Sequence, residues 1–160
     1  NASKFVHIHL ANTQGTPSTS KNDIKQGVIF ESLDLWLITK LTKVIDNATK
    51  SFLQFEYCDA RTYIEEFFWK DFCDNYLELI KGRIYNEEPN QQKSRQSAIY
   101  TLHHCLKTLF KMFAPFMPHI VEQLHTDIFK ATDSIHQKGN WPKLEEFYQD
   151  DQTAVFRILR

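Results

Sequence analysis

Apolar residues recur three and four positions apart through residues 64–80. The set comprises Ile64, Phe67, Phe68, Phe72, Tyr76, Leu79 and Ile80. This spacing places them on one side of a helix and predicts a helix over residues 65–85. Glu66 and Lys70 fall on the opposite face, four apart in the order that stabilises a solvated helix. Because the apolar face is so broad and aromatic, we expect the helix to pack against at least two others.

Similar patterns predict those partner helices. One should begin near Ser32 or Asp34, either of which can cap it, and another near Asn90 or Ser94. A shorter helix should start at Pro118, which suits a first turn, and run to about Phe129. The apolar set that it turns inward is Ile120, Val121, Leu124 and Ile128. No useful stretch alternates with period two, so the predicted fold class is all-α, an antiparallel helix bundle.

The same reading divides the chain into segments. Residues 1–142 should form the bundle, with the end of a helix at 1–10 and a loop at 11–30, where glycine, proline, serine and threonine gather. Residues 143–160 should form a linker and the start of a further helix. Both ends look like cut helices, so we expect a piece of a longer protein.

Composition narrows the class of protein. The 160 residues are 42% hydrophobic and 14% aromatic, which is typical of a globular domain. Cys58, Cys73 and Cys105 are widely spaced, which predicts neither a disulfide framework nor a zinc site. We read these cysteines as reduced side chains, which predicts a cytoplasmic location. No apolar run approaches the roughly 20 residues of a membrane span, so we expect no membrane association.

Charge is unevenly distributed along the chain. Lys and Arg outnumber Asp and Glu by six to four in residues 1–54 and by six to three in 91–140, whereas residues 55–90 carry four against nine. The net charge is only −1. Any contact with nucleic acid should therefore use a local basic patch and not the whole surface.

Catalytic patterns are absent from the sequence. It contains no GxGxxG, GxxxxGK[ST], GxSxG or HExxH. The adjacent pair His103 and His104 diverges on a helix, so we predict no metal site. Asp71 and Asp74, three apart, could form an acid–base pair, although a salt-bridged surface is much commoner. A helical enzyme that uses these four residues stays an open alternative.

Basic residues suggest RNA binding more than catalysis. Lys40, Lys43 and Lys50 share one helical face, and Lys4 and His7 lie in the aromatic N-terminal segment. Lysine neutralises phosphates, and exposed aromatic rings stack on unpaired bases. A merely solvated lysine face is the alternative.

Several motifs resemble one known family. The run FFWKDFCDNYLELIKGRIY at residues 67–85 resembles the principal helix of the anticodon-binding domain in the valyl-tRNA synthetase family of class I aminoacyl-tRNA synthetases. NASKFV at 1–6, SLDLWLITKL at 32–41, APFMPHIVEQLH at 114–125 and SIHQKGNWP at 134–142 resemble flanking segments in the same order. The isoleucyl and leucyl families share the bundle and the proline corner, and they remain alternatives, as does a helical protein-interaction domain.

The resemblance implies a function and partners. The domain would bind the anticodon stem-loop of a valine-accepting tRNA, while a catalytic domain of the same chain, outside this sequence, activates valine with ATP. The fragment would hold no cofactor and perform no catalysis, and the parent would be a monomer. The residues expected to contact tRNA along one continuous basic flank are Lys4, His7, Lys40, Lys43, Lys50, Lys93 and Arg95.

A second group of residues is assigned to the core. It comprises Trp36, Phe67, Phe68, Trp69, Phe72 and Tyr76. Asp74 is placed with them as a hydrogen-bond acceptor that holds a neighbouring helix, the alternative being a water-facing carboxylate.

Overall fold

The computed structural model describes residues 2–11, 20–86, 88–137 and 141–146. These residues form helices and turns without a strand, so the predicted all-α class is confirmed. The helices are α1 (Ala2–Ala11), α2 (Ser20–Lys25), α3 (Ser32–Leu53), α4 (Tyr57–Glu66), α5 (Leu77–Tyr85), α6 (Gln92–Phe113) and α7 (Pro118–Phe129). A π-helix, η1 (Phe67–Tyr76), joins α4 to α5, and two 3₁₀ turns, η2 (Pro89–Gln91) and η3 (Leu144–Glu146), complete the set. α2 occupies part of the loop expected at 11–30, whose residues 12–19 lie outside the described ranges. The expected final helix also lies outside the described residues.

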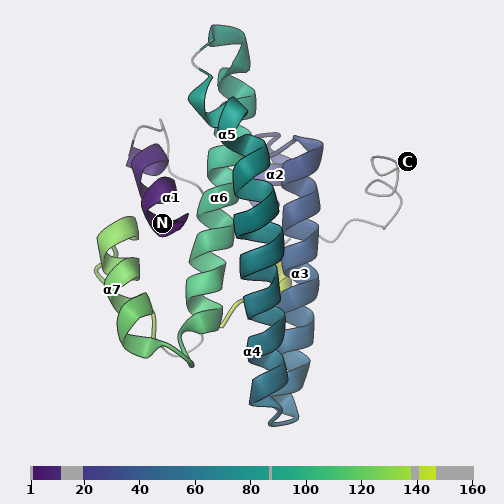
Figure 1. The fold of residues 1–160 in the computed structure, drawn as a ribbon, viewed down its shortest axis with the longest axis vertical. Coiled ribbons are helices and arrows are strands. Elements are labelled where there is room, and N and C mark those ends of the chain that lie inside the picture. Colours follow the sequence, from purple (N-terminus) through teal and green to yellow (C-terminus); the bar gives the residue numbers. More distant parts are fainter. Residues whose placement is uncertain (1, 12–19, 87, 138–140, 147–160) are drawn as a thin grey trace.

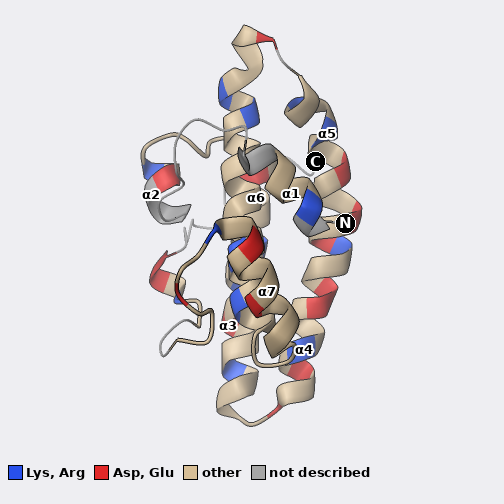
Figure 2. Ribbon diagram, turned by 90° about the vertical axis from the view of Figure 1, so that its left-hand side faces the viewer, with Lys and Arg blue, Asp and Glu red and all other residues tan. Residues whose placement is uncertain are grey.

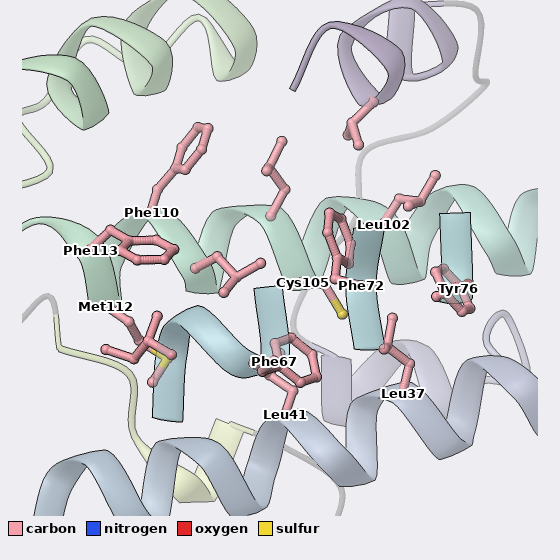
Figure 3. Close-up of a cluster of buried hydrophobic side chains, with 14 of the residues drawn as sticks. Leu37, Leu41, Phe67, Phe72, Tyr76, Leu102, Cys105, Phe110, Met112 and Phe113 are labelled. Carbon is pink, nitrogen blue, oxygen red and sulfur yellow. The ribbon is translucent and has the colours of Figure 1, made fainter. Parts of the chain in front are cut away.

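The long helices are arranged around α6. Figure 1 shows α3 and the continuous rod α4–η1–α5 on one side of α6, and α1 and α7 on the other. Leu37 and Leu41 from α3 meet Phe67 and Phe72 from η1 and a row of α6 side chains (Figure 3). All four are at most 1% exposed, so the core lies where the three helices meet.

The π-helix changes which residues face that core. Phe67 and Phe72 are both buried although they are five positions apart, whereas the α-helical period brings residues three and four apart to one face. Trp69 is 61% exposed, so its assignment to the core is wrong. Leu79, which the apolar pattern placed on the inward stripe, is also 61% exposed. The wider π turn shifts the register within the aromatic run, and Trp69 is left facing solvent.

The other core assignments have mixed outcomes. Phe67, Phe72 and Tyr76 are buried as predicted, while Trp36 and Phe68 are partly buried and pack against the core. Asp74 is exposed, so the alternative of a water-facing carboxylate is correct.

α7 closes the other side of the bundle. Pro118 occupies its first turn, and the preceding residue, Met117, lies outside the helical region with φ −133° and ψ 61°, as expected before a proline. The helix ends at Phe129 as predicted, but Ile120 is 57% exposed and does not point inward. Beyond α7, the indole N–H of Trp141 donates to Thr49 Oγ1 at 2.9 Å, which fixes this segment against α3.

Candidate nucleic-acid interface

The three lysines of α3 lie on its solvent side, and two of them have acidic partners. Lys40 Nζ lies 2.8 Å from Asp71 Oδ1 of η1 and 5.1 Å from the centre of the Trp36 ring. Lys50 Nζ lies 2.7 Å from Asp46 Oδ2, one turn earlier. Lys43 is exposed and has no ion pair within the described part of the chain. This face of α3 therefore carries charges of both signs.

The remaining predicted tRNA contacts lie elsewhere. Lys4 is exposed and His7 half-buried on α1, which α6 separates from α3 (Figure 1). Lys93 is exposed in the first turn of α6. Arg95, in the same turn, is half-buried, and its Nε is buried without a hydrogen-bond partner among the described residues.

These positions do not form one continuous flank. Figure 2 shows Lys and Arg interspersed with Asp and Glu along the visible helices instead of a continuous basic band. The residues predicted to contact tRNA thus fall into two groups, one on α3 and one on α1 with the start of α6. The expectation of a single basic flank is corrected accordingly.

A buried carboxylate fixes the start of α6 against the start of α3. Asp34, at 0% exposure, accepts two hydrogen bonds of 2.9 Å from the Arg83 guanidinium and one of 2.8 Å from the Tyr76 hydroxyl. The Ser97 hydroxyl donates to Asp34 as well, and Arg83 also donates to the Ser94 carbonyl at 2.7 Å. Although burial opposes the charge, the hydrogen bonds and charge of Asp34 raise the pKa of Arg83. Four elements are thereby linked through one side chain.

Sequence reasoning misjudged this residue. α3 begins at Ser32, as predicted, but neither Ser32 nor Asp34 caps it: Glu31 precedes the helix and no side chain bonds its first turn. A signal was present, since Asp34 lies three and seven positions before the buried residues Leu37 and Leu41. A carboxylate on the apolar stripe of a helix must find partners in the core.

A second buried pair attaches α2 to α6. His104 Nε2 lies 2.5 Å from Asp23 Oδ2, and both residues are buried. Burial lowers the pKa of His104, whereas the hydrogen bond to Asp23 and its charge act in the opposite direction. Burial, together with His104 and Lys107, lowers the pKa of His103 to about 3. His104 is buried, and His103 is half-buried beside it against the ring of Phe129.

The enzyme alternative finds no support in this geometry. Asp71 pairs with Lys40, and His104 pairs with Asp23 on the far side of α6, so the proposed acid–base groups have separate partners. Burial, with Asp74, raises the pKa of the Cys73 thiol to about 11, which leaves it protonated. Within the described ranges, no three His, Cys, Asp or Glu residues come together as metal ligands.

Comparison with known proteins identifies the family. The profile described as "Anticodon-binding domain of tRNA ligase" matches residues 34–160. The chain belongs to this family. Within this anticodon-binding domain, none of the described helices is long and apolar enough to cross a membrane.

Several proteins similar to this anticodon-binding domain are named valine--tRNA ligase. This chain is 49% identical over 142 residues to the valine--tRNA ligase of Ehrlichia ruminantium (strain Gardel). The matched region covers 89% of this chain and 16% of the relative. The chain is 43% identical over 150 residues to that of Wolbachia sp. subsp. Brugia malayi (strain TRS), covering 94% and 16%. For Rickettsia felis the identity is 43% over 142 residues, covering 88% and 16%. The chain thus spans about a sixth of the length of these relatives.

Proposed function

We propose that this domain recognises the anticodon stem-loop of a valine-accepting tRNA on behalf of a valine–tRNA ligase. The observation that carries the proposal is the identity of 43–49% to valine--tRNA ligases across about nine-tenths of the chain. Activation of valine with ATP would take place in a catalytic part that precedes residue 1 in the same cytoplasmic polypeptide. That part would make the other contacts with the tRNA.

The α3 lysines are the first candidates for phosphate contact. Lys43 has no competing carboxylate among the described residues, so a phosphate meets a free ammonium group there. Lys40 and Lys50 are 45% and 67% exposed, and surface ion pairs of this kind contribute only about 0–1 kcal/mol. A phosphate oxygen can therefore displace Asp71 or Asp46 at little cost.

The second group supports the same role from the end of the bundle. The Asp34 network holds the start of α6 against the start of α3. Lys93 and Arg95 in that first turn therefore keep a fixed position relative to Lys40. Lys4 and His7 on α1 complete the proposed contacts on the other side of α6.

The test is tRNA binding by the domain as a function of salt. The variant Lys40→Glu/Lys43→Glu should bind valine tRNA more weakly. The slope of log K against log salt should fall in magnitude by about 0.7–0.9 for each phosphate that the variant no longer neutralises. Fluorescence anisotropy of labelled tRNA measures both quantities.

A matched control separates local contact from net charge. Lys70 and Lys81 are exposed and pair with Glu66 and Glu78, so Lys70→Glu/Lys81→Glu makes the same charge change on η1 and α5. If both double variants give the same affinity and salt slope, α3 is not the phosphate-binding face.

A further inference from the structure

An apolar groove opens over α6 between η1 and α7. It encloses about 250 Å³, and its rim is formed by Trp69 of η1, by Met117 and by Ile120 of α7, with Phe110 of α6 in its lining. We call it the α6–α7 groove. Pockets for small molecules usually enclose about 300–1,000 Å³, so this hollow suits one or two protruding side chains better than a free ligand.

Three large apolar side chains at the rim of the groove are exposed to solvent. Trp69 is 61% exposed, Ile120 57% and Met117 43%. An apolar patch of this kind, gathered around a hollow, is typical of an interaction surface. The sequence pattern supports the same view for Ile120, because it belongs to an apolar stripe that would ordinarily be covered.

Charge argues against RNA as the occupant. Glu65 is the ionisable residue in the lining, and its Oε1 lies 3.5 Å from Arg61 Nε. A tryptophan could stack on a base, but the lining provides no cation to neutralise the accompanying phosphate. The chemistry of the groove fits an apolar protein segment with a basic flank opposite Glu65.

The position of α1 indicates which protein segment. α1 packs on α6 and α7, with Val6 fully buried between the helices. Its N-terminal end lies above α7 in the view of Figure 1 and on the side of the α4–α5 rod in Figure 2. α1 therefore covers the part of α6 immediately above the groove, and polypeptide leading into α1 arrives beside the groove's upper end.

We propose that the α6–α7 groove docks an apolar segment of the same polypeptide, from the part that precedes residue 1. This inference rests on the proposed function, under which the catalytic part precedes α1. It also uses the length of the relatives, of which this chain covers only 16%. The groove would fix the orientation of the anticodon-binding domain relative to the catalytic part, so that both ends of one tRNA are held at once.

Photo-cross-linking in the intact ligase tests the proposal without tRNA. The photoreactive residue p-benzoylphenylalanine replaces Trp69, and the matched control replaces Leu79, which is equally exposed at 61% but lies on α5 outside the groove. We expect the Trp69 position to cross-link within one polypeptide to peptides that precede residue 1, at several times the control yield and independently of protein concentration. Mass spectrometry identifies the peptides.

Other results overturn the proposal. A cross-link whose yield rises with protein concentration would assign the groove to a second copy, and a yield no higher than at Leu79 would leave it unoccupied. Hydrogen exchange gives an independent measurement: Trp69→Lys should raise amide exchange in α7 of the intact ligase several-fold, and Leu79→Lys should not. If the groove proposal fails, the cross-link is missing while tRNA binding is unchanged. If the proposed function fails, the domain no longer discriminates between tRNAs while the cross-link is still formed.

Discussion

The Asp34 network offers a quantitative test of how the bundle is held together. In the variant Asp34→Leu, the Arg83 guanidinium loses both carboxylate hydrogen bonds while its side chain stays only 21% exposed. The hydroxyls of Tyr76 and Ser97 lose their acceptor as well. Leucine fills most of the space, so the cost comes from stranded polar groups and not from a cavity.

Magnitudes follow from the burial of each partner. Removing one member of a buried ion pair costs about 3–5 kcal/mol, because the other charge is left without compensation. We expect this range for Asp34→Leu. Tyr76→Phe removes one hydrogen bond to Asp34, which keeps its other donors. This change should lower the free energy of unfolding by about 1.5–3 kcal/mol.

The double variant Asp34→Leu/Arg83→Met is the decisive member of the series. Replacing a buried ion pair by apolar residues of similar volume is often close to neutral. The double variant should therefore be more stable than Asp34→Leu alone. Urea unfolding followed by circular dichroism measures the free energies, and an unchanged m-value shows that the native state is intact.

The control is Asp74→Ala, an exposed aspartate whose loss should change stability by no more than about 0.5 kcal/mol. Strictly additive costs of Asp34→Leu and Arg83→Met would refute the reasoning, since they would show no coupling across the pair. A cost for Asp34→Leu equal to that of Asp74→Ala would refute it as well.

Two further predictions concern the core. Phe67→Ala should cost about 3–5 kcal/mol in urea unfolding because Phe67 is 1% exposed, whereas Trp69→Ala, two residues on, should cost less than about 1 kcal/mol; equal costs would contradict the π register. Burial lowers the pKa of His103 to about 3, whereas the unfolded chain has a pKa of about 6.5 at this residue. The contribution of neutral His103 to stability is therefore complete above about pH 6.5 and is lost as the pH falls towards 3. Thermal unfolding across that window should depend less on pH in His103→Phe, with exposed His119→Gln as the control; identical pH profiles in the two variants would argue against a buried neutral imidazole.

The bounds of a helix could be predicted from the sequence where its apolar residues define a single buried face. α7 starts at Pro118 and ends at Phe129 as expected, because a proline and an apolar stripe define it unambiguously. The register of η1 could not be predicted in this way. With apolar residues at 67, 68, 69 and 72, several helical phases place aromatic rings inward, and only the packing against α3 and α6 selects Phe67 and Phe72.

The candidate interface was less predictable than the fold. The exposure of Lys40, Lys43 and Lys50 follows from helical periodicity and is observed. The ionic partners of these lysines cannot be predicted from periodicity, because Asp71, which pairs with Lys40, lies 31 positions away in the sequence. The separation of Lys4 from the α3 lysines depends on where α1 packs, which is a tertiary property.

Recognition of the valine anticodon is the central claim, and binding of anticodon stem-loop RNAs to this domain tests it most directly. The comparison uses the stem-loop of a valine tRNA and the same stem-loop with its anticodon bases exchanged for those of an isoleucine tRNA, at one fixed low salt concentration. Because phosphate contacts are common to both RNAs, any difference reports contacts to the bases. The account predicts tighter binding of the valine stem-loop; equal affinity for the two RNAs would contradict it.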